Sequence, residues 1–447
     1  MMRAQVGVVL ALGAVYTIAL ALVNRDAPEA YMDEIFHIPQ AQKYCAGRFE
    51  EWDPKITTFP GLYVFSALYA HGVTAVSDTA FCSTPVLRSI NGLFAVGNAF
   101  LFMKLRARIV PSDSHPITHA LMLATFPIHF FFTFLFYTDS GAIFFVLLMY
   151  YLAERVDLRI YPSARGSYVL SALSGTVAVF FRQTNIIWVA FVAGTVVVKC
   201  VELSHGSYIY GSTKQDARLS DSIVVRYSAR RVFINFLVVV CTNVVSLLQL
   251  VWPFLAIAAA FVVFLVKNGG IVVGDKSNHQ AGFHGAQILY FIVVLASGFG
   301  ISLFTPGNVK RFADSVRRNA KDTKGLLFMV CVVVTMLLVI VFFSPVHPFM
   351  LADNRHYTFY IWRKFFLKHP LAKYLPGSFY LFFGWRCWTE LRTRKCCFHH
   401  RLEDINQPEL QLWTTIIAYS IVNVATLYIY LTKPYTWVDG SIARFMW

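Results

Sequence analysis

The chain has 447 residues, of which 57% are hydrophobic, 16% aromatic and only 14% charged, and its mean hydropathy is +0.56. A soluble domain of this composition would aggregate, so the sequence predicts an all-α polytopic membrane protein with a single membrane domain over residues 1–447. The net charge of +15 suits a nucleic-acid-binding protein in principle. However, the basic residues fall in short loops between apolar segments, where they orient helices in the membrane, so nucleic acid is excluded as a partner.

Apolar runs of membrane-spanning length recur from the N-terminus onward. The first, residues 6–23, predicts a retained signal anchor, because the first helix of a polytopic protein sets its topology. Residues 59–76 and 232–250 are ambiguous. We expect the former to form a membrane-embedded or interfacial helix, since a full crossing would contradict the loop charges. Further spans are predicted at residues 88–103, 118–136, 140–153, 167–181, 185–201, 250–267, 286–304, 325–344, 374–391 and 413–431.

The loop charges predict which face of the membrane each loop occupies. Residues 24–59 carry four basic and seven acidic side chains, whereas residues 309–324 carry six basic and two acidic ones. Basic loops stay in the cytosol, so we expect the acidic first loop on the opposite face, which in a eukaryotic secretory membrane is the lumen. The same alternation predicts a cytosolic connector at 201–231 and luminal polar loops at 268–285 and 344–357.

Two adjacent acids, Asp33 and Glu34, stand in the first loop. Such a pair suits general-base catalysis, because repulsion and burial raise one pKa towards working pH while the other group stays ionised. If the segment is helical, His37 shares a face with Asp33. The alternative is that Asp33 only caps a helix. No second ligand stands at a zinc-site spacing from His37, so we expect it to form hydrogen bonds and not to bind a metal.

Two later loops carry further polar clusters. Cationic and imidazole donors at a membrane boundary suit a phosphate group that is anchored in that membrane. The alternatives are a snorkelling lysine in the first of these loops and a simple acid–arginine turn in the second. The candidate ligands are Lys276, His279, His284, Asp353, Arg355, His356 and Tyr357.

The remaining chemical signals are weaker. Arg182 follows an apolar run and is either a membrane anchor or a substrate ligand. The eight cysteines show no paired spacing, so we expect small core residues and neither a disulfide nor a zinc framework. Nucleotide-binding glycine motifs and Asp-x-Asp clusters are absent from the sequence. It therefore predicts no metal and no other cofactor.

Five segments resemble the endoplasmic-reticulum α-1,2-glucosyltransferases that use dolichyl-phosphate glucose. They are MDEIFHIPQAQ at 32–42, WDPKITT at 52–58, RQTNIIW at 182–188, NGGIVVGDKSNH at 268–279 and HPFMLADNRHYTFY at 347–360. The segments follow one another over most of the chain, so the resemblance is specific. It implies the GT-C glycosyltransferase fold, with roughly 11–14 transmembrane helices and a luminal catalytic first loop, in the endoplasmic-reticulum membrane.

The resemblance also implies a reaction. Glucose passes from dolichyl-phosphate glucose to the terminal glucose of dolichyl-diphosphate-linked Glc2Man9GlcNAc2, which completes the glycan used for N-glycosylation. The donor is β-linked, so an α-1,2 product implies inversion in one displacement. Asp33 is the implied base and Glu34 the second choice. Stabilisation of the leaving phosphate is implied for Lys276, His279, Arg355 and His356. Trp52 and Tyr63 are candidates to stack on sugar faces and Asp53 to bind sugar hydroxyls, with interfacial anchoring as the alternative for the two aromatic residues.

Two other functions share many of these features. A transporter or scramblase would also be helical, but it would be expected to carry charged residues or broken helices at mid-membrane, whereas the polar clusters here stand at span ends. A mannosyl-transferring relative of the same fold shares every feature except the motif segments.

Overall fold

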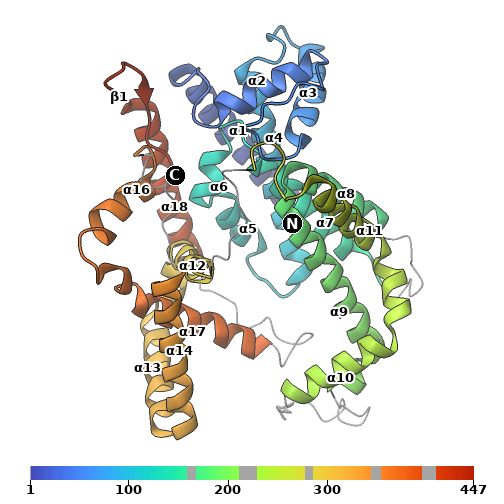
Figure 1. The fold of residues 1–447 in the computed structure, drawn as a ribbon, viewed down its shortest axis with the longest axis vertical. Helices are drawn as coiled ribbons and strands as arrows, with labels where there is room; N and C mark the ends of the chain where they lie inside the picture. The colour runs from blue at the N-terminus through green and yellow to red at the C-terminus, as the bar shows by residue number, and fades with distance from the viewer. Residues whose placement is uncertain (1, 159–167, 211–228, 277–284, 344–353, 395–408) are drawn as a thin grey trace. The chain divides into compact units, whose positions relative to one another are not determined.

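The computed structural model describes residues 2–158, 168–210, 229–276, 285–343, 354–394 and 409–447, and these residues are mostly helical (Figure 1). The first α-helices are α1 (Met2–Asp26), α2 (Glu34–Cys45), α3 (Gly61–Thr74), α4 (Thr84–Ile109), α5 (Pro116–Ala124), α6 (Pro127–Phe132), α7 (Asp139–Arg155) and α8 (Val169–Phe181). They are followed by the 3-10 turn η1 (Gln183–Asn185), α9 (Ile186–Tyr210), α10 (Ala229–Thr242), α11 (Val244–Asn268), α12 (Gln287–Leu303), α13 (Pro306–Lys321) and α14 (Thr323–Phe342).

The C-terminal part adds shorter elements. These are α16 (Tyr357–Ile361), a π-helical turn η3 (Trp362–Phe366), a 3-10 turn η4 (Ala372–Tyr374), α17 (Gly377–Arg394), α18 (Glu409–Thr432), and the antiparallel strands β1 (Tyr435–Thr436) and β2 (Ile442–Ala443). The chain divides into two compact units. Unit 1 comprises residues 1–111 and 132–279, and unit 2 comprises residues 112–131 and 280–447. Each unit is described by itself below.

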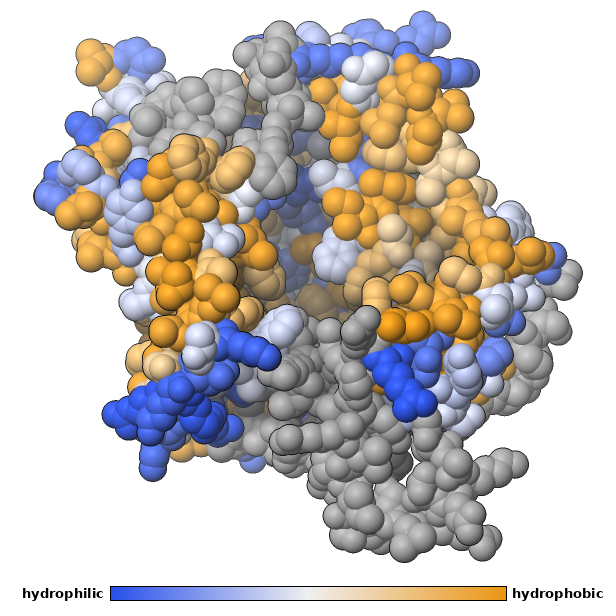
Figure 2. Space-filling view, turned by 60° about the horizontal axis from the view of Figure 1, so that its bottom comes forward, coloured by the Kyte–Doolittle hydropathy of each residue, from blue (hydrophilic) through white to orange (hydrophobic). Residues whose placement is uncertain are grey.

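Six helices in the described part of the chain are long and apolar enough to cross a membrane. They lie at Arg3–Asp26, Thr84–Ile109, Gln183–Tyr210, Val244–Asn268, Thr323–Phe342 and Glu409–Thr432, and shorter apolar helices lie at Val169–Phe181, Arg231–Thr242 and Gln287–Ala296. Hydrophobic residues cover broad areas of the face in Figure 2, bordered by hydrophilic ones. Only 6% of the most apolar window of α14 is buried, as expected for a surface in contact with lipid. The all-α polytopic fold is thus confirmed, and the number of 11–14 spans stays a prediction.

The structure corrects one predicted span and divides one ambiguous segment. The apolar run 118–136 is not one helix, because Pro127 begins α6 after a break at Thr125 and Phe126. Proline lacks the amide hydrogen that a continuing helix needs and disfavours helical backbone in the residue before it. The ambiguous segment 232–250 is divided between α10 and α11 at Asn243, which has non-helical dihedrals.

Unit 1 is built on a row of packed helices. Helix α1 packs on α4, α4 on α7, and α7 on α8, while α9 packs on α11. Aromatic side chains fill the centre of the row, with Phe94, Phe145 and Phe181 in mutual ring contact. The short helices α2 and α3 pack on each other at one end of this row (Figure 1). Helix α3 has 14 residues, fewer than the roughly 20 that a span needs.

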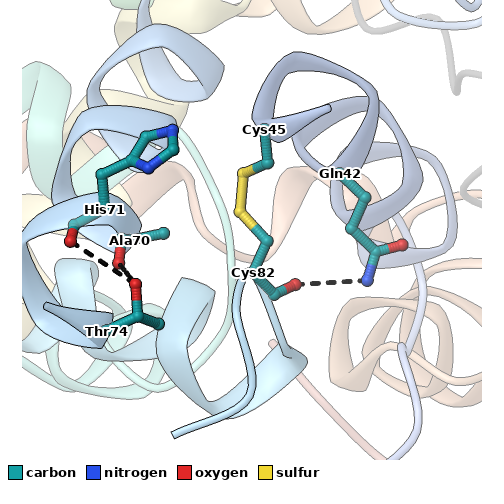
Figure 3. The surroundings of a disulfide bond; sticks show 6 residues. All are labelled: Gln42, Cys45, Ala70, His71, Thr74 and Cys82. Carbon is teal, nitrogen blue, oxygen red and sulfur yellow. Dashed lines mark hydrogen bonds between the residues drawn. A yellow bond between two sulfur atoms is a disulfide. The ribbon is translucent and has the colours of Figure 1, made fainter. Parts of the chain in front are cut away.

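A disulfide between Cys45 and Cys82 joins the last residue of α2 to the loop before α4 (Figure 3). The amide of Gln42 also donates a hydrogen bond of 3.3 Å to the Cys82 carbonyl oxygen. The expectation that the cysteines form no disulfide was therefore wrong. The two partners are 37 residues apart in the sequence, and only the packing of α2 beside α4 brings them together.

Unit 2 contains the remaining helices and the hairpin. Helix α12 packs on α17 and α18, α13 on α14, and α5 on α18. The Asn423 amide donates to the Thr125 carbonyl oxygen at 2.8 Å, which satisfies a backbone group at the break after α5. Beyond α18, Arg444 donates to the carbonyl oxygens of Tyr430 and Leu431 and so caps the last turn of that helix.

Candidate active site

The two adjacent acids have opposite surroundings. Asp33 occupies the N-cap position of α2, its side chain is exposed, and that side chain makes no capping hydrogen bond. Its backbone N–H donates to the Tyr137 hydroxyl at 3.1 Å. Met32, just before it, has a φ of 56°, a left-handed conformation that a residue with a side chain adopts only when its surroundings impose it. Asp33 is thus the N-cap residue of α2, as the alternative interpretation expected, but its side chain forms no capping hydrogen bond.

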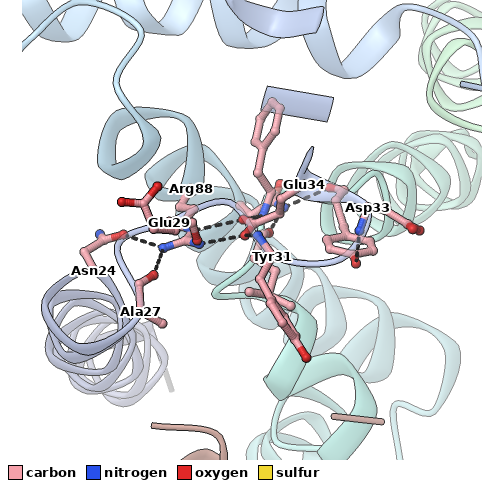
Figure 4. Close-up of polar contacts among 11 residues, drawn as sticks. Asn24, Ala27, Glu29, Tyr31, Asp33, Glu34 and Arg88 are labelled. Carbon is pink, nitrogen blue, oxygen red and sulfur yellow. Dashed lines mark hydrogen bonds and ion pairs between the residues drawn. The ribbon is translucent and has the colours of Figure 1, made fainter. Parts of the chain in front are cut away.

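Glu34 is completely buried and forms a bidentate ion pair with Arg88 on α4 (Figure 4). The Arg88 Nη2 and Nε atoms lie 2.6 and 2.8 Å from the two carboxylate oxygens. The same oxygens accept backbone hydrogen bonds from Phe136 at 2.6 Å and Tyr31 at 3.1 Å. The carboxylate of Glu34 is thus fully engaged in holding three chain segments together.

Arg88 is also completely buried, and its other donors are used on the chain around the end of α1. Its guanidinium donates to the Asn24 side chain at 3.2 Å and to the carbonyl oxygens of Ala27 and Glu29 at 2.8 and 2.9 Å. One turn along α4, Asn91 donates to the carbonyl oxygens of Leu135 and Tyr137. Helix α4 therefore fixes both segments that surround Asp33.

His37 lies one turn after Asp33 and contacts two tyrosines. Its Nδ1 atom is 2.6 Å from the Tyr63 hydroxyl, and its ring packs edge-on against Tyr137. Burial, and secondly the positive charge of Arg182, lower the pKa of His37 to about 4. The imidazole is therefore neutral near pH 7 and can both donate and accept a hydrogen bond.

Tyr63 is itself completely buried, so the expectation that its ring stacks on a sugar was wrong. Its ring packs edge-on against Trp52, which is only partly buried, and the Trp52 indole donates to the Ile56 carbonyl oxygen at 3.3 Å. Burial raises the pKa of Tyr63, and the carboxylates of Asp53 and Asp33 add smaller contributions in the same direction. Both acids thus lie close enough to Tyr63 to influence it electrostatically.

Hydrogen bonds join the segment 51–57 to α2 and to two segments that are distant in the sequence. Gln40 on α2 donates to the Glu51 carbonyl oxygen at 2.7 Å and accepts the Asp53 N–H at 2.9 Å. The Thr57 carbonyl oxygen accepts hydrogen bonds from the Gln183 amide at 2.8 Å and from the Val273 N–H at 3.2 Å. Three of the segments singled out in the sequence, 52–58, 182–188 and 268–279, therefore meet at Thr57.

Gly274 allows the closest approach between these segments. The Asp275 N–H donates to the Pro54 carbonyl oxygen at 2.8 Å, and Gly274 has a φ of 85°. A Cβ atom on Gly274 would lie 2.4 Å from that same oxygen, so only glycine fits there. Lys276 follows with an exposed side chain whose ammonium group donates to the Asn268 carbonyl oxygen.

Arg182 lies between α8 and η1 and forms an ion pair with Asp139, the first residue of α7. Both side chains are partly exposed, at 43% and 35%. A guanidinium carries five N–H donors, so this ion pair leaves donors with which Arg182 can bind a substrate anion. The Arg182 charge acts on His37, which places it at the same end of unit 1 as Asp33.

The second group of predicted ligands lies in unit 2, where the C-terminal residues hold it. The Met446 N–H donates to the Arg355 carbonyl oxygen at 3.0 Å, and the Tyr357 N–H donates to the Met446 carbonyl oxygen at 3.1 Å. The Nδ1 atom of His356 is 2.7 Å from the carbonyl oxygen of Trp447. Burial raises the pKa of Tyr357. The predicted ligands His279, His284 and Asp353 lie outside the described residues.

Comparison with known proteins identifies the family. The sequence profile of the DIE2/ALG10 family matches residues 27–434. The chain belongs to the DIE2/ALG10 family. Three relatives carry the name Dol-P-Glc:Glc(2)Man(9)GlcNAc(2)-PP-Dol alpha-1,2-glucosyltransferase. They come from Rattus norvegicus (36% identity over 95% of this chain and 94% of the relative), Homo sapiens (34%, 95% and 94%) and Arabidopsis thaliana (31%, 95% and 96%).

Sequence reasoning missed several residues that build the site of this DIE2/ALG10 member. Arg88 gave a usable signal, because an arginine at the start of an apolar span needs a partner. Asp139 immediately precedes the predicted span 140–153. Tyr137 lies with Asp139 in a polar segment between two predicted spans, which the loop charges place in the lumen. Gln40 gave no signal, since single glutamines are common in membrane-protein loops. Within the described residues, no group of three or more His, Cys, Asp or Glu side chains is placed to hold a metal ion.

Proposed function

We propose that this protein transfers glucose from dolichyl-phosphate glucose to the terminal glucose of dolichyl-diphosphate-linked Glc2Man9GlcNAc2, forming an α-1,2 linkage. Support comes from the family match over residues 27–434 and from the names of relatives that cover nearly the whole chain. The observation that carries the proposal is local. The acid of the family-like motif, Asp33, is exposed beside His37 and Tyr137, while its neighbour Glu34 is buried.

Asp33 is the proposed general base. The acceptor hydroxyl oxygen attacks the anomeric carbon of the donor glucose, the bond from that carbon to the phosphate oxygen breaks, and Asp33 takes the hydroxyl proton. A single displacement of this kind inverts the β-linked donor to an α-linked product and leaves no sugar on the protein. The exposure of Asp33 gives its carboxylate access to a substrate hydroxyl, which Glu34 lacks.

Glu34 is proposed to position Asp33 and to take no proton. Its two oxygens accept two hydrogen bonds from Arg88 and one each from Tyr31 and Phe136, and its side chain is inaccessible. Moving Glu34 to an acceptor hydroxyl would leave the buried Arg88 charge without its counter-ion, which is costly. The pair instead fixes the first turn of α2 and hence the location of Asp33.

The leaving dolichyl phosphate needs charge stabilisation more than protonation. In unit 1, Arg182 and Lys276 are the proposed cationic partners of the phosphate. The charge of Arg182 acts on His37. Lys276 directly follows Asp275, whose N–H donates to the Pro54 carbonyl oxygen. His37, Trp52 and Asp53 are the proposed sugar contacts at this end of unit 1. Arg355, His356 and Tyr357, together with His279, His284 and Asp353, stay predictions as substrate-binding residues.

The proposed location is the endoplasmic-reticulum membrane, with the α2 end of unit 1 in the lumen. The acidic charge of residues 24–59 supports this orientation. The Cys45–Cys82 disulfide supports it independently, because disulfides persist in oxidising compartments and are rare in the cytosol. Membrane lipids and the two dolichol-linked substrates are the proposed partners, without a metal or other cofactor.

Transfer by the purified protein in lipid nanodiscs tests the proposal. Dolichyl-phosphate glucose and the Glc2Man9GlcNAc2 lipid acceptor should give a product with one added α-1,2-linked glucose, identified by mass spectrometry and by the NMR signal of its anomeric proton. A chelator should leave the rate unchanged, and dolichyl-phosphate mannose should give no product. Transfer of mannose in place of glucose, or no transfer by folded protein, would contradict the assignment.

A further inference from the structure

A cavity of about 310 Å³ lies in unit 1 where α9, α10 and α11 meet. Its walls include the α9 residues Cys200, Ser204 and His205, the residue Asn243 between α10 and α11, and the α11 residues Ser246 and Gln249. The rest of the lining is apolar, with valine and leucine side chains from the same helices. The volume falls at the lower end of the range typical of small-molecule sites.

This cavity is far from Asp33 and Arg182. Helix α9 begins at Ile186, just after Arg182, and its residues rise by about 1.5 Å each, so His205 lies roughly 28 Å along the helix from its start. That length is close to the thickness of the hydrocarbon core of a membrane. Helices α2 and α10 accordingly lie at opposite ends of unit 1 in Figure 1. The cavity therefore stands at the other membrane face from the proposed catalytic base.

Helix irregularities border the cavity on two sides. His205 interrupts α9 with a φ of −132° and a ψ of 17°, and Asn243 separates α10 from α11. The Ser204 hydroxyl and the Asn243 amide donate to backbone carbonyl oxygens one turn earlier in the chain. In membrane proteins, broken helices at membrane depth are tolerated where they are buried in protein or line a polar cavity.

Three polar side chains of the lining have no hydrogen-bond partner among the described residues. Within the described part of the chain, His205, Ser246 and Gln249 form no hydrogen bond or ion pair. Ser246 and Gln249 are three residues apart on α11 and so share one face of a helix that is apolar enough to span the membrane. The side chains of Ser246 and Gln249 are exposed and that of His205 is partly buried, so their polar groups are accessible to a ligand.

We propose that this cavity binds the hydroxyl end of a neutral lipid alcohol, such as a sterol or a diacylglycerol. Serine, glutamine and neutral histidine side chains each donate and accept hydrogen bonds, as a lipid hydroxyl does. Among the described residues, the cavity lining contains no Lys, Arg, Asp or Glu, so this part of the lining lacks the cations that phosphate headgroups prefer and the acids that amines prefer. Its valine and leucine walls suit the first carbons of an apolar tail.

Cys200 provides a probe inside the cavity. It is a free, partly buried thiol in the lining, whereas the free thiol of Cys241 is exposed near the end of α10, outside the lining, and serves as an internal control. The full-length protein is placed in phosphatidylcholine nanodiscs, and alkylation of each cysteine by N-ethylmaleimide is followed by mass spectrometry. Cholesterol, dioleoylglycerol or dioleoyl phosphatidic acid is added at equal mole fraction in separate arms.

The proposal predicts that cholesterol or dioleoylglycerol slows Cys200 alkylation severalfold, that phosphatidic acid does not, and that alkylation of Cys241 is unaffected throughout. The double substitution Ser246→Ala and Gln249→Leu should abolish the protection. Thr195→Val, on the same helix as Cys200 but outside the cavity, should retain it. Equal protection by phosphatidic acid, protection that survives the double substitution, no protection by either alcohol, or a Cys200 that fails to react without added lipid would each overturn the proposal.

Discussion

The two ends of α2 are both fixed to the same short stretch of chain, but by different chemistry. At the N-terminal end, Glu34 forms a buried ion pair with Arg88, and at the C-terminal end Cys45 forms a disulfide with Cys82. The ion pair lies directly beside the proposed base, whereas the disulfide lies three turns away. Both attachments stabilise the helix, and only the first one also determines where the Asp33 carboxylate lies.

Removal of one partner of the ion pair should have the largest effect on stability. Arg88→Met leaves the Glu34 carboxylate buried without a counter-ion, which should lower the free energy of unfolding by about 3–5 kcal/mol. Thermal unfolding of the detergent-purified protein measures the loss. The double variant Arg88→Met with Glu34→Leu is the control, and it should recover much of the stability because neither charge remains. An Arg88→Met variant as stable as wild type would contradict the structural role of the pair.

Removal of the disulfide should cost about 2–4 kcal/mol, because the bond closes a loop of nearly forty residues in the unfolded chain. Cys45→Ala with Cys82→Ala should therefore unfold at lower temperature, while glucose transfer per folded molecule changes much less than in Arg88→Met. Cys331→Ser, at an exposed free thiol, is the matched control and should leave unfolding unchanged. If the disulfide variant lost more glucose transfer per folded molecule than Arg88→Met, the claim that only the ion pair determines the location of Asp33 would be contradicted.

The pH dependence of stability should report His37. Its pKa falls from 6.5 to about 4 on folding, so between these values the unfolded chain binds one more proton than the folded protein. The contribution of His37 to the free energy of unfolding is therefore complete above pH 6.5 and is lost as the pH falls towards 4. At about 1.4 kcal/mol per pKa unit, this loss is at most about 3 kcal/mol. Unfolding temperatures measured across this range should show the decline in wild type, and it should be weaker in His37→Gln. Identical pH profiles would exclude this role.

Tyr63→Phe should have the smallest effect. It removes the hydroxyl that contacts His37 and keeps the buried ring, so it should cost about 1 kcal/mol of stability. Tyr69→Phe, which removes a partly buried hydroxyl bonded to Ser89, is the comparison variant. The two should unfold alike, but only Tyr63→Phe should raise the KM for the acceptor. Equal KM values would place the His37–Tyr63 contact outside the substrate site.

Much of this architecture followed from the sequence, for identifiable reasons. The apolar runs and loop charges predicted a helical membrane protein, and the segment that follows Asp33 is helical, which is the condition under which His37 was expected to share a face with Asp33. The different environments of the two acids could not be predicted, because they depend on Arg88, which is 54 residues away from Glu34. Residue spacing alone does not reveal which distant segments pack together.

Other differences have similar physical origins. The Cys45–Cys82 bond was missed because a separation of 37 residues has no recognisable motif. The break near Pro127 was readable in principle, since proline begins helices readily but interrupts their interior. The contact of the C-terminal residues with Arg355, His356 and Tyr357 depends on tertiary packing and had no local signal.

The central claim is that Asp33 takes the proton of the acceptor hydroxyl and that Glu34 positions Asp33. The kcat values of two isosteric variants test this claim most directly. Asp33→Asn should lower kcat for glucose transfer by about 10²- to 10⁴-fold while unfolding at the wild-type temperature, because the changed side chain is exposed. Glu34→Gln should unfold at lower temperature and, per folded molecule, retain at least tenfold more activity than Asp33→Asn. An Asp33→Asn variant with near wild-type kcat, or a folded Glu34→Gln variant that is the less active of the two, would contradict the account.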